Sequence, residues 1–387
     1  MDGERGSGSG GTEDEGEGES KARRGRFVGH SLDYITHQVG NNAPGQEAWL
    51  AGTRRGDVTS SGLGSSDEWG ARSCGSGCRI LTIDEARYSC MQTLREALRQ
   101  AEERGAAIGH FNLSDLVLLK AVFTAARDLD LPVLVGASEG ERGFMGVRQT
   151  AALVKSLREE FGFPIFLNAD HTHSRASAEE VAKAGFDSIV FDLSALPFEE
   201  NIRQTREAVE ALKSIHPGML VEGEIGDIGS GSEIHETMTA SAAGLTTPEQ
   251  ARQYVDETGV DILAPAVGNR HGMSPSMVRG ETKQHLDIAR IGAIRKAAGV
   301  PLTLHGGSGT DDEDFRRAIA AGISIVHINT ELRVAWRRSL EESLRSDPNE
   351  VVPYKIFPPV VEAVRGVVES RMELFSGAGV GVRRKAS

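Results

Sequence analysis

The chain has 387 residues, a formal net charge of −13 at pH 7, 39% hydrophobic residues and 46 glycines. An acidic chain of this kind repels nucleic acids and anionic membranes, and no stretch approaches the roughly 18 consecutive apolar residues of a membrane-spanning helix. Three unevenly spaced cysteines, Cys74, Cys78 and Cys90, indicate a reducing compartment and no disulfide framework. We therefore expect a cytoplasmic protein with neither a nucleic acid nor a membrane as partner.

The first 80 residues differ in composition from the rest of the chain. They hold 18 of the glycines, in stretches such as "GERGSGSGGTEDEGEGES". Such a segment buries too little apolar surface to offset the entropy of ordering, so we expect a low-complexity, disordered extension over 1–80. A regulatory tail and a dispensable extension are both compatible with it. Residues 376–387 are expected to form a second flexible tail.

Residues 81–375 are expected to form one folded domain. An amphipathic helical stretch over 81–105 comes first, followed by short apolar runs that alternate with helix-like segments. The eight apolar runs are 106–113, 131–138, 163–172, 186–194, 219–226, 260–268, 300–309 and 322–330.

This alternation is typical of parallel sheet, in which near-continuous apolar strands are buried on both faces. Eight such units over roughly 250 residues favour an α/β fold of the closed (β/α)8, or TIM barrel, type. An open doubly wound sheet is the alternative, but "IGHFNLSD" after the first strand lacks its G-x-G-x-x-G turn. Residues 332–375 predict two or three further helices, which could cap the barrel or bury an interface in a homodimer or homotetramer.

Polar residues follow the predicted strands. In such a barrel the carboxyl ends of the strands surround the catalytic mouth. Taken singly, a histidine there is more often structural, and an aspartate more often caps the next helix. The residues at these ends are Asn112, Ser138, Asp170, His171, Asp192, Glu222, Glu224, Asn269, His271, His305, His327 and Asn329.

Three of these residues, His171, His271 and His305, come from strands 3, 6 and 7. Three neutral imidazoles with an open fourth position are the usual build of a catalytic zinc site. We interpret them as zinc ligands. His173, two residues after His171, is expected to lie at the rim.

The segment "LHGGSGTDDEDF" after the seventh strand suits an anion. Its glycines, Gly306, Gly307 and Gly309, let backbone amides approach a ligand, and Thr310 with Glu313 predicts a capping box that starts the next helix. Phosphate binding after strands 7 and 8 recurs in barrels of this type.

The carboxylates are expected to have separate roles. Asp170 is placed to exchange a proton with a substrate oxygen. Asp192 and Glu224 could hold a second divalent cation or orient the histidines. Glu233 lies in the Gly-rich stretch "GDIGSGSEIHE", which predicts either a mobile loop with a further catalytic acid or a solvated surface loop.

From residue 81 to residue 375 the chain resembles the class II, zinc-dependent ketose-bisphosphate aldolases, which act on fructose or tagatose bisphosphate. The motifs that carry the resemblance are "DH" at 170–171, "FDLS…FEENI" at 191–202, "VEGEIG" at 221–226, "GNRHG" at 268–272, "LHGGSG" at 304–309 and "INTELR" at 328–333.

The resemblance implies reversible aldol cleavage of a ketose 1,6-bisphosphate, most simply fructose 1,6-bisphosphate, to dihydroxyacetone phosphate and glyceraldehyde 3-phosphate. It implies that the three histidines hold zinc, that Asp170 handles the C4 hydroxyl and that Glu233 exchanges the proton at C3. Asp192 and Glu224 match a second cation site, and a monovalent cation can assist at the phosphate. The implied phosphate pocket consists of Gly272, Gly306, Ser308, Asn329 and Thr330, with Asn112 and Ser138 as further substrate contacts.

Two positions depart from the family pattern. His327 stands where the family has an asparagine that touches substrate, and Asn168 stands where it commonly has a histidine. The first change bears on substrate identity or rate more than on metal chemistry.

Other readings remain open. Tagatose bisphosphate or another ketose phosphate is an alternative substrate. A metal-dependent hydrolase barrel would explain the H-x-H of "HTH", although in that class the motif belongs on the first strand. A non-catalytic phosphosugar-binding homologue is the non-enzymatic alternative.

Overall fold

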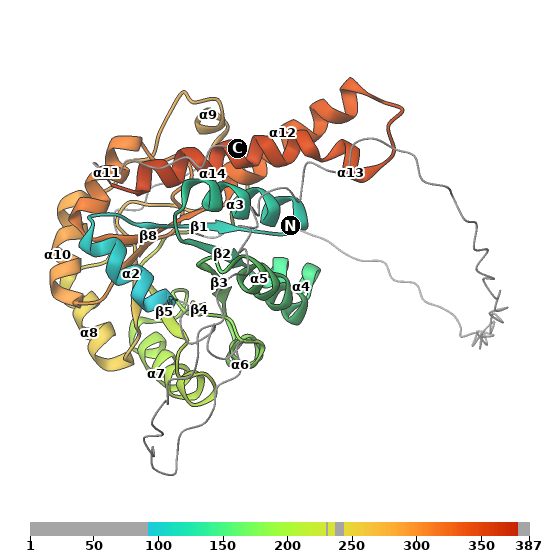
Figure 1. Ribbon diagram of the computed structural model, residues 1–387. Coiled ribbons are helices and arrows are strands. Elements are labelled where there is room, and N and C mark those ends of the chain that lie inside the picture. Colours follow the sequence, from blue (N-terminus) through green and yellow to red (C-terminus); the bar gives the residue numbers. More distant parts are fainter. Residues whose placement is uncertain (1–91, 230, 237–243, 378–387) are drawn as a thin grey trace, which may run out of the picture. The chain divides into compact units, whose positions relative to one another are not determined.

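A computed structural model of the chain describes residues 92–229, 231–236 and 244–377 (Figure 1). The extension over 1–80 and most of the tail over 376–387 lie outside these residues, as does the first part of the helical stretch predicted from residue 81. In the part described, every helix is too short or too polar to cross a lipid bilayer.

Eight parallel strands pair in sequence order, and the last pairs with the first to close a barrel. The predicted (β/α)8 fold is confirmed, and the open doubly wound alternative is wrong because the first and last strands leave no sheet edge. The strands are β1 (Ile108–Asn112), β2 (Val133–Ala137), β3 (Ile165–Thr172), β4 (Ser188–Phe191), β5 (Leu220–Ile225), β6 (Ile262–Pro265), β7 (Leu302–Leu304) and β8 (Ile323–Ile328).

Helices surround the barrel (Figure 1). Two or three helices were expected beyond the last strand, and the described residues form three, the last of which, α14 (Pro358–Phe375), packs against α12 (Thr330–Ser346) and α3 (Leu116–Leu129). The helices are α2 (Leu94–Glu103), α3 (Leu116–Leu129), α4 (Glu139–Met145), α5 (Val147–Phe161), α6 (Arg175–Ala184), α7 (Phe198–Ile215), α8 (Pro248–Thr258), α9 (Pro275–Val278), α10 (Ile288–Ala298), α11 (Asp312–Ala321), α12 (Thr330–Ser346), α13 (Pro353–Ile356) and α14 (Pro358–Phe375).

The helix α2 closes the amino-terminal end of the barrel. It begins at Leu94, because Thr93 and Glu96 form a reciprocal capping box at its start. Its apolar face packs against strand residues that point into the barrel, among them Ile108 and Phe166. These apolar side chains of α2 and the strands fill the bottom of the barrel and are called the plug below.

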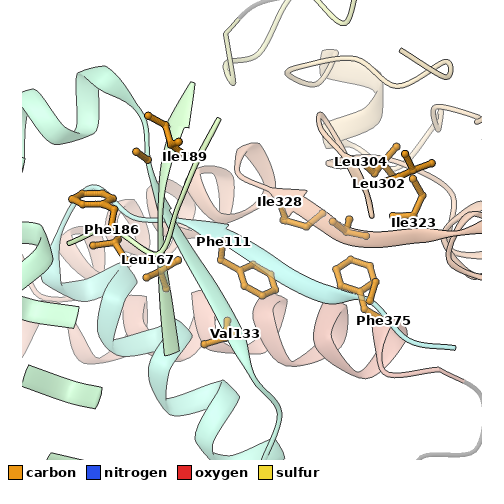
Figure 2. Close-up of a cluster of buried hydrophobic side chains, with 14 of the residues drawn as sticks. Phe111, Val133, Leu167, Phe186, Ile189, Leu302, Leu304, Ile323, Ile328 and Phe375 are labelled. Carbon is orange, nitrogen blue, oxygen red and sulfur yellow. The ribbon is translucent and has the colours of Figure 1, made fainter. Parts of the chain in front are cut away.

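Side chains on a strand alternate between its two faces, and this alternation separates two environments. Along β1, Ile108 joins the plug, and His110 and Asn112 follow it on the same inward face nearer the mouth. Phe111, on the opposite face, joins the apolar layer between strands and helices, in which Figure 2 shows it with Phe375 of α14. The interior is thus apolar at the bottom and polar at the mouth.

The plug predicts a stability effect. Leu98 of α2 is 2% exposed, so Leu98→Ala should lower the free energy of unfolding by about 2–5 kcal/mol through lost transfer energy and a cavity. Leu116→Ala, at a position 61% exposed, is the matched control and should cost about 0.5 kcal/mol or less. Urea unfolding followed by circular dichroism measures both, and equal effects would contradict the plug.

Candidate active site

The end of β3 has an irregular backbone that presents two of the expected site residues. The register between β3 and β4 shifts between Ala169 and Thr172, and His171 has a φ of 32°. Only His171 and one other non-glycine residue have a positive φ in the described part of the chain. Since such a conformation costs free energy for a side chain with a Cβ, the surrounding contacts must hold it.

Asp192, at the end of β4, orients the ring of His171. Its Oδ2 accepts a hydrogen bond of 2.9 Å from His171 Nδ1, so Nε2 is the nitrogen left for a ligand. Burial disfavours the charged ring, but the charge of Asp170 and the bond to Asp192 outweigh it and raise the pKa of His171 to about 9.

His305, directly after β7, is held by a buried carboxylate of β5. Its Nε2 lies 2.6 Å from Glu222 Oε1, and Thr303 donates to the other oxygen of Glu222. His305 is fully buried, and its remaining nitrogen, Nδ1, points toward Glu224 Oε2 at 2.8 Å. Burial opposes protonation, but the two glutamates raise the pKa of His305 well above its ordinary value.

The third histidine, His271, lies in the loop after β6. Its backbone N–H donates to Ile228 O at 3.1 Å, which ties this loop to the one after β5. Burial and the neighbouring histidines lower the pKa of His271 to about 3, so its ring is neutral and able to ligate.

The three rings meet at one point. His171 Nε2 and His271 Nε2 are buried without a hydrogen-bond partner, and His305 Nδ1 and Glu224 Oε2, which lie 2.8 Å apart, have no partner besides each other. One ligand atom from each of these four residues lies within 4.8 Å of the others. Buried polar atoms without partners are costly unless they share an ion, and this donor set suits zinc. The residues therefore fit a divalent metal, with Glu224 in the same group as the histidines.

Asp192 and Glu224 were expected to hold a second cation or to orient the histidines. Asp192 bonds to the ring of His171, whereas Glu224 faces the same point as the histidine nitrogens. Ser194 Oγ lies 2.7 Å from Asp192 Oδ1 and 3.2 Å from Glu224 Oε1, so a hydroxyl bridges the two carboxylates. Asp192 thus contacts the candidate metal group, which consists of His171, Glu224, His271 and His305, through the ring of His171. His173 lies outside the group, with a side chain 55% exposed and Nδ1 bonded to the backbone oxygen of Asp192.

Asp170 stands beside the metal group and is 5% exposed. Its Oδ2 accepts from Asn112 Nδ2 at 2.8 Å, whereas its buried Oδ1 has no hydrogen-bond partner. Burial opposes ionisation, but the charge of His171 and the adjacent ring of His327 hold the pKa of Asp170 well below its usual range. The carboxylate is therefore ionised and has an oxygen free to take a proton.

A small pocket adjoins Asp170 and His271. Six of the seven residues expected to contact substrate line it, and Ser138 does not. Ser138 instead caps α4 through its hydroxyl. Glu233 is exposed and is not among the lining residues, although its neighbour Ser232 is. The six are Asn112, Gly272, Gly306, Ser308, Asn329 and Thr330.

One end of this pocket is the start of α12, where Asn329 and Thr330 line it. Ser308 Oγ accepts from the backbone N–H groups of Asn329 and Glu331, both at 3.3 Å, and Asn329 makes no side-chain cap. A helix start with few internal partners attracts a phosphate. Gly306 has a φ of 59°, and a Cβ there would lie 2.3 Å from Arg270 O, so only glycine fits.

The predicted capping box of Thr310 and Glu313 is wrong. α11 begins one residue later, and Asp311 caps it by accepting from Glu313 N at 2.9 Å. Thr310 accepts instead from Gln284 Nε2 at 2.9 Å. Aspartate is at least as good a cap as threonine, which the sequence pattern did not weigh. Three acidic residues in the first turn of α11 also make that helix start unsuitable for phosphate.

His327 lines the pocket, and the ring of His110 stacks on its ring. Their rings are parallel within 5° at 3.5 Å, and His110 Nε2 lies 3.2 Å from Asn168 Oδ1. His327 lies in the pocket wall with Nδ1 3.4 Å from Asp170 Oδ1. Each ring keeps one buried nitrogen without a hydrogen-bond partner, Nδ1 of His110 and Nε2 of His327. Burial, with the neighbouring His110 and His305, keeps the pKa of His327 well below its ordinary value.

Several buried polar residues that support the site were not predicted. Glu222 was noted only as a strand-end residue, although its period-two spacing with Glu224 placed both inside the barrel. Arg142 of α4 is 2% exposed, and its guanidinium donates to the backbone oxygens of Ala137 and Asp170. The charge-rich helix start "SEGER" was the available signal, but only the tertiary structure shows where its side chains point.

Comparison with known proteins identifies relatives over the barrel. A family model described as "Fructose-bisphosphate aldolase class-II" matches residues 92–380. A probable fructose-bisphosphate aldolase of Bacillus subtilis is 35% identical over 289 residues, covering 74% of this chain and 98% of the relative. The fructose-bisphosphate aldolase of Thermus caldophilus is 34% identical over 305 residues, covering 73% and 97%.

Solved structures agree. The YdjI aldolase from Escherichia coli K12 has a TM-score of 0.61 and 28% identity, covering 75% of this chain and 98% of its own. A putative fructose-1,6-bisphosphate aldolase from Coccidioides immitis has a TM-score of 0.62 and 28% identity, covering 74% and 96%. With the barrel, the clustered histidines and these relatives in agreement, the chain belongs to the class II fructose-bisphosphate aldolase family, whose members are lyases that cleave carbon–carbon bonds.

Proposed function

We propose that this chain is a zinc-dependent aldolase that cleaves fructose 1,6-bisphosphate reversibly to dihydroxyacetone phosphate and glyceraldehyde 3-phosphate. The observation that carries the proposal is one arrangement: three buried imidazole nitrogens that face one point, beside an ionised Asp170 and a small pocket that reaches the start of α12. Relatives named fructose-bisphosphate aldolase support the substrate. Tagatose bisphosphate, which differs at C4, is the alternative.

Different residues of the chain would bind the metal and the phosphate of the substrate. His171, His271 and His305 would hold zinc, with Glu224 Oε2 facing the same point. The chemistry that a bound zinc ion supplies is stabilisation of negative charge on the oxygens of the ketose fragment. Amides and hydroxyls around Ser308 and Thr330 would bind the C1 phosphate and fix its distance from the metal group.

Two acids would move protons. Asp170 Oδ1, buried and unpartnered, would take the proton of the C4 hydroxyl as the C3–C4 bond breaks. Glu233 would exchange the proton at C3. Its loop is tied to the pocket because Ser232 O accepts from Thr330 Oγ1 at 3.1 Å and from Arg333 Nη1 at 3.2 Å.

The remaining parts of the proposal concern the oligomeric state, the additional cations and the cellular location. A homodimer or homotetramer is supported by large apolar side chains left exposed, Phe144 at 80%, Val351 at 80% and Tyr354 at 77%. A second divalent cation at Asp192 and Glu224, an assisting monovalent cation and a cytoplasmic location belong to the same proposal and rest on the family resemblance.

Metal removal tests the chemistry. Dialysis against EDTA should abolish cleavage of fructose 1,6-bisphosphate, and one equivalent of Zn²⁺ should restore it, because no lysine stands at a strand end to form an imine instead. A coupled assay for dihydroxyacetone phosphate measures the rate. Full activity in protein shown to be metal-free by elemental analysis would refute the proposal.

The histidine pKa values predict how zinc affinity depends on pH. With a pKa of about 9, His171 is protonated at pH 7 without metal, and His305 is held protonated as well. Zinc must displace these protons, so affinity should rise roughly tenfold or more per pH unit from pH 7 toward 9. Calorimetry in buffers of different ionisation enthalpy should count at least one proton released per zinc. Uptake without proton release would contradict the raised pKa values.

Asp170→Asn should lower kcat by roughly 100- to 10,000-fold while zinc remains bound, because the amide cannot accept the hydroxyl proton. Asp256→Asn, at an exposed position on α8, is the control and should keep wild-type kinetics. Both variants and the wild type are assayed with fructose and with tagatose bisphosphate. Cleavage of neither sugar by the zinc-loaded wild type would overturn the substrate assignment.

A further inference from the structure

Glu141 is an acid of α4 that the reaction scheme leaves without a role. It is 6% exposed and accepts three hydrogen bonds. Its Oε2 accepts from Ser138 N at 2.8 Å and from Asn112 Nδ2 at 2.9 Å, and its Oε1 accepts from Arg333 Nη2 at 2.9 Å. Glutamate is seldom buried to this degree without a specific set of partners.

Capping alone does not explain these contacts. Glu141 and Ser138 form a capping box at the start of α4, as Glu96 and Thr93 do at the start of α2. Glu96 is exposed, and its side chain bonds only to Thr93. The bonds from Glu141 to Asn112 and to Arg333 are therefore additional to what a helix start requires.

Asn112 links Glu141 to the catalytic acid. Its Nδ2 donates to Glu141 Oε2 at 2.9 Å and to Asp170 Oδ2 at 2.8 Å, so both amide hydrogens are engaged by carboxylates. This fixes the amide plane and occupies Oδ2 of Asp170, which leaves Oδ1 as the oxygen without a partner. Without Glu141, Asn112 would lose the second anchor that defines its orientation.

Arg333 of α12 lowers the free-energy cost of burying the carboxylate of Glu141. Its guanidinium pairs with Glu141 at 2.9 Å, which offsets the cost of placing a second carboxylate near Asp170. The same guanidinium donates to Ser232 O, next to Glu233. One chain of hydrogen bonds thus runs from the loop after β5, through Arg333, Glu141 and Asn112, to Asp170.

We propose that Glu141 is a positioning residue: through Asn112 it holds the carboxylate of Asp170 with one oxygen free for the substrate hydroxyl, and through Arg333 it ties that carboxylate to the loop of Glu233. The kinetic consequence rests on the proposed aldolase function. The coupling among the side chains is a property of the folded chain and does not depend on substrate.

A double-mutant cycle on the full-length, zinc-loaded protein tests this coupling. Glu141→Ala should lower kcat for fructose 1,6-bisphosphate by about 10- to 100-fold, but by less than about twofold in an Asn112→Ala background. Glu141→Gln should be faster than Glu141→Ala but slower than the wild type, because its one oxygen can still accept from Ser138 N and Asn112 Nδ2 whereas its NH2 group cannot accept from Arg333. Additive losses, or a glutamine variant as slow as the alanine variant, would overturn the proposal.

Glu96→Ala is the matched control, since it removes a capping-box glutamate far from the site. It should shift the urea midpoint, leave kcat within about twofold of wild type and add to Asn112→Ala without coupling.

The same cycle measured on the urea midpoint needs no substrate. The double variant Asn112→Ala/Glu141→Ala should unfold near the midpoint of the weaker single variant, and a shift equal to the sum of the two would refute the coupling. A wild type that cleaves no ketose bisphosphate would refute the proposed function, and this unfolding cycle would still decide the role of Glu141.

Discussion

The site depends on the cost of leaving a polar atom buried without a partner. Four such atoms, three imidazole nitrogens and one carboxylate oxygen, face one point at the barrel mouth. Two of the rings are fixed from their opposite side, that of His171 by Asp192 and that of His305 by Glu222. Buried polar atoms without partners are costly, and a divalent cation would satisfy all four at once.

The rest of the barrel maintains this arrangement. Helix α2 and the inward apolar residues close the bottom, so water enters only at the mouth, where the polar residues are. The low dielectric of the interior strengthens the pairing of carboxylates with imidazoles, which is why the pKa values of His171 and Asp170 move in opposite directions. An acidic chain also needs a local attraction for a phosphorylated ligand, and the start of α12, which borders the pocket, is placed to supply it.

A layer of hydrogen bonds behind the metal group sets the position of the reacting acid. Arg142 fixes the backbone at the end of β3, and Asn112 and Glu141 fix the side chain of Asp170. The stacked pair of His110 and His327 fills the floor on the other side. These groups come from β1, β3, β8 and α4, so the geometry of one carboxylate depends on four separate segments of the chain.

The sequence by itself determined the eight strands, the polar ends of those strands and the residue types that suit zinc and phosphate, because apolar runs that alternate with helix-like segments are local properties of the chain. It also led to the right family through short motifs such as "DH" and "HGGSG". It mispredicted the cap of α11, where two adjacent residues competed for one role. Only the tertiary structure decided which nitrogen of each histidine is free, that Glu224 faces the same point as the histidines, and that Glu141 reaches Asp170 through Asn112. Those facts depend on side-chain directions across strands far apart in the chain, and no local pattern of residues encodes a distance between them.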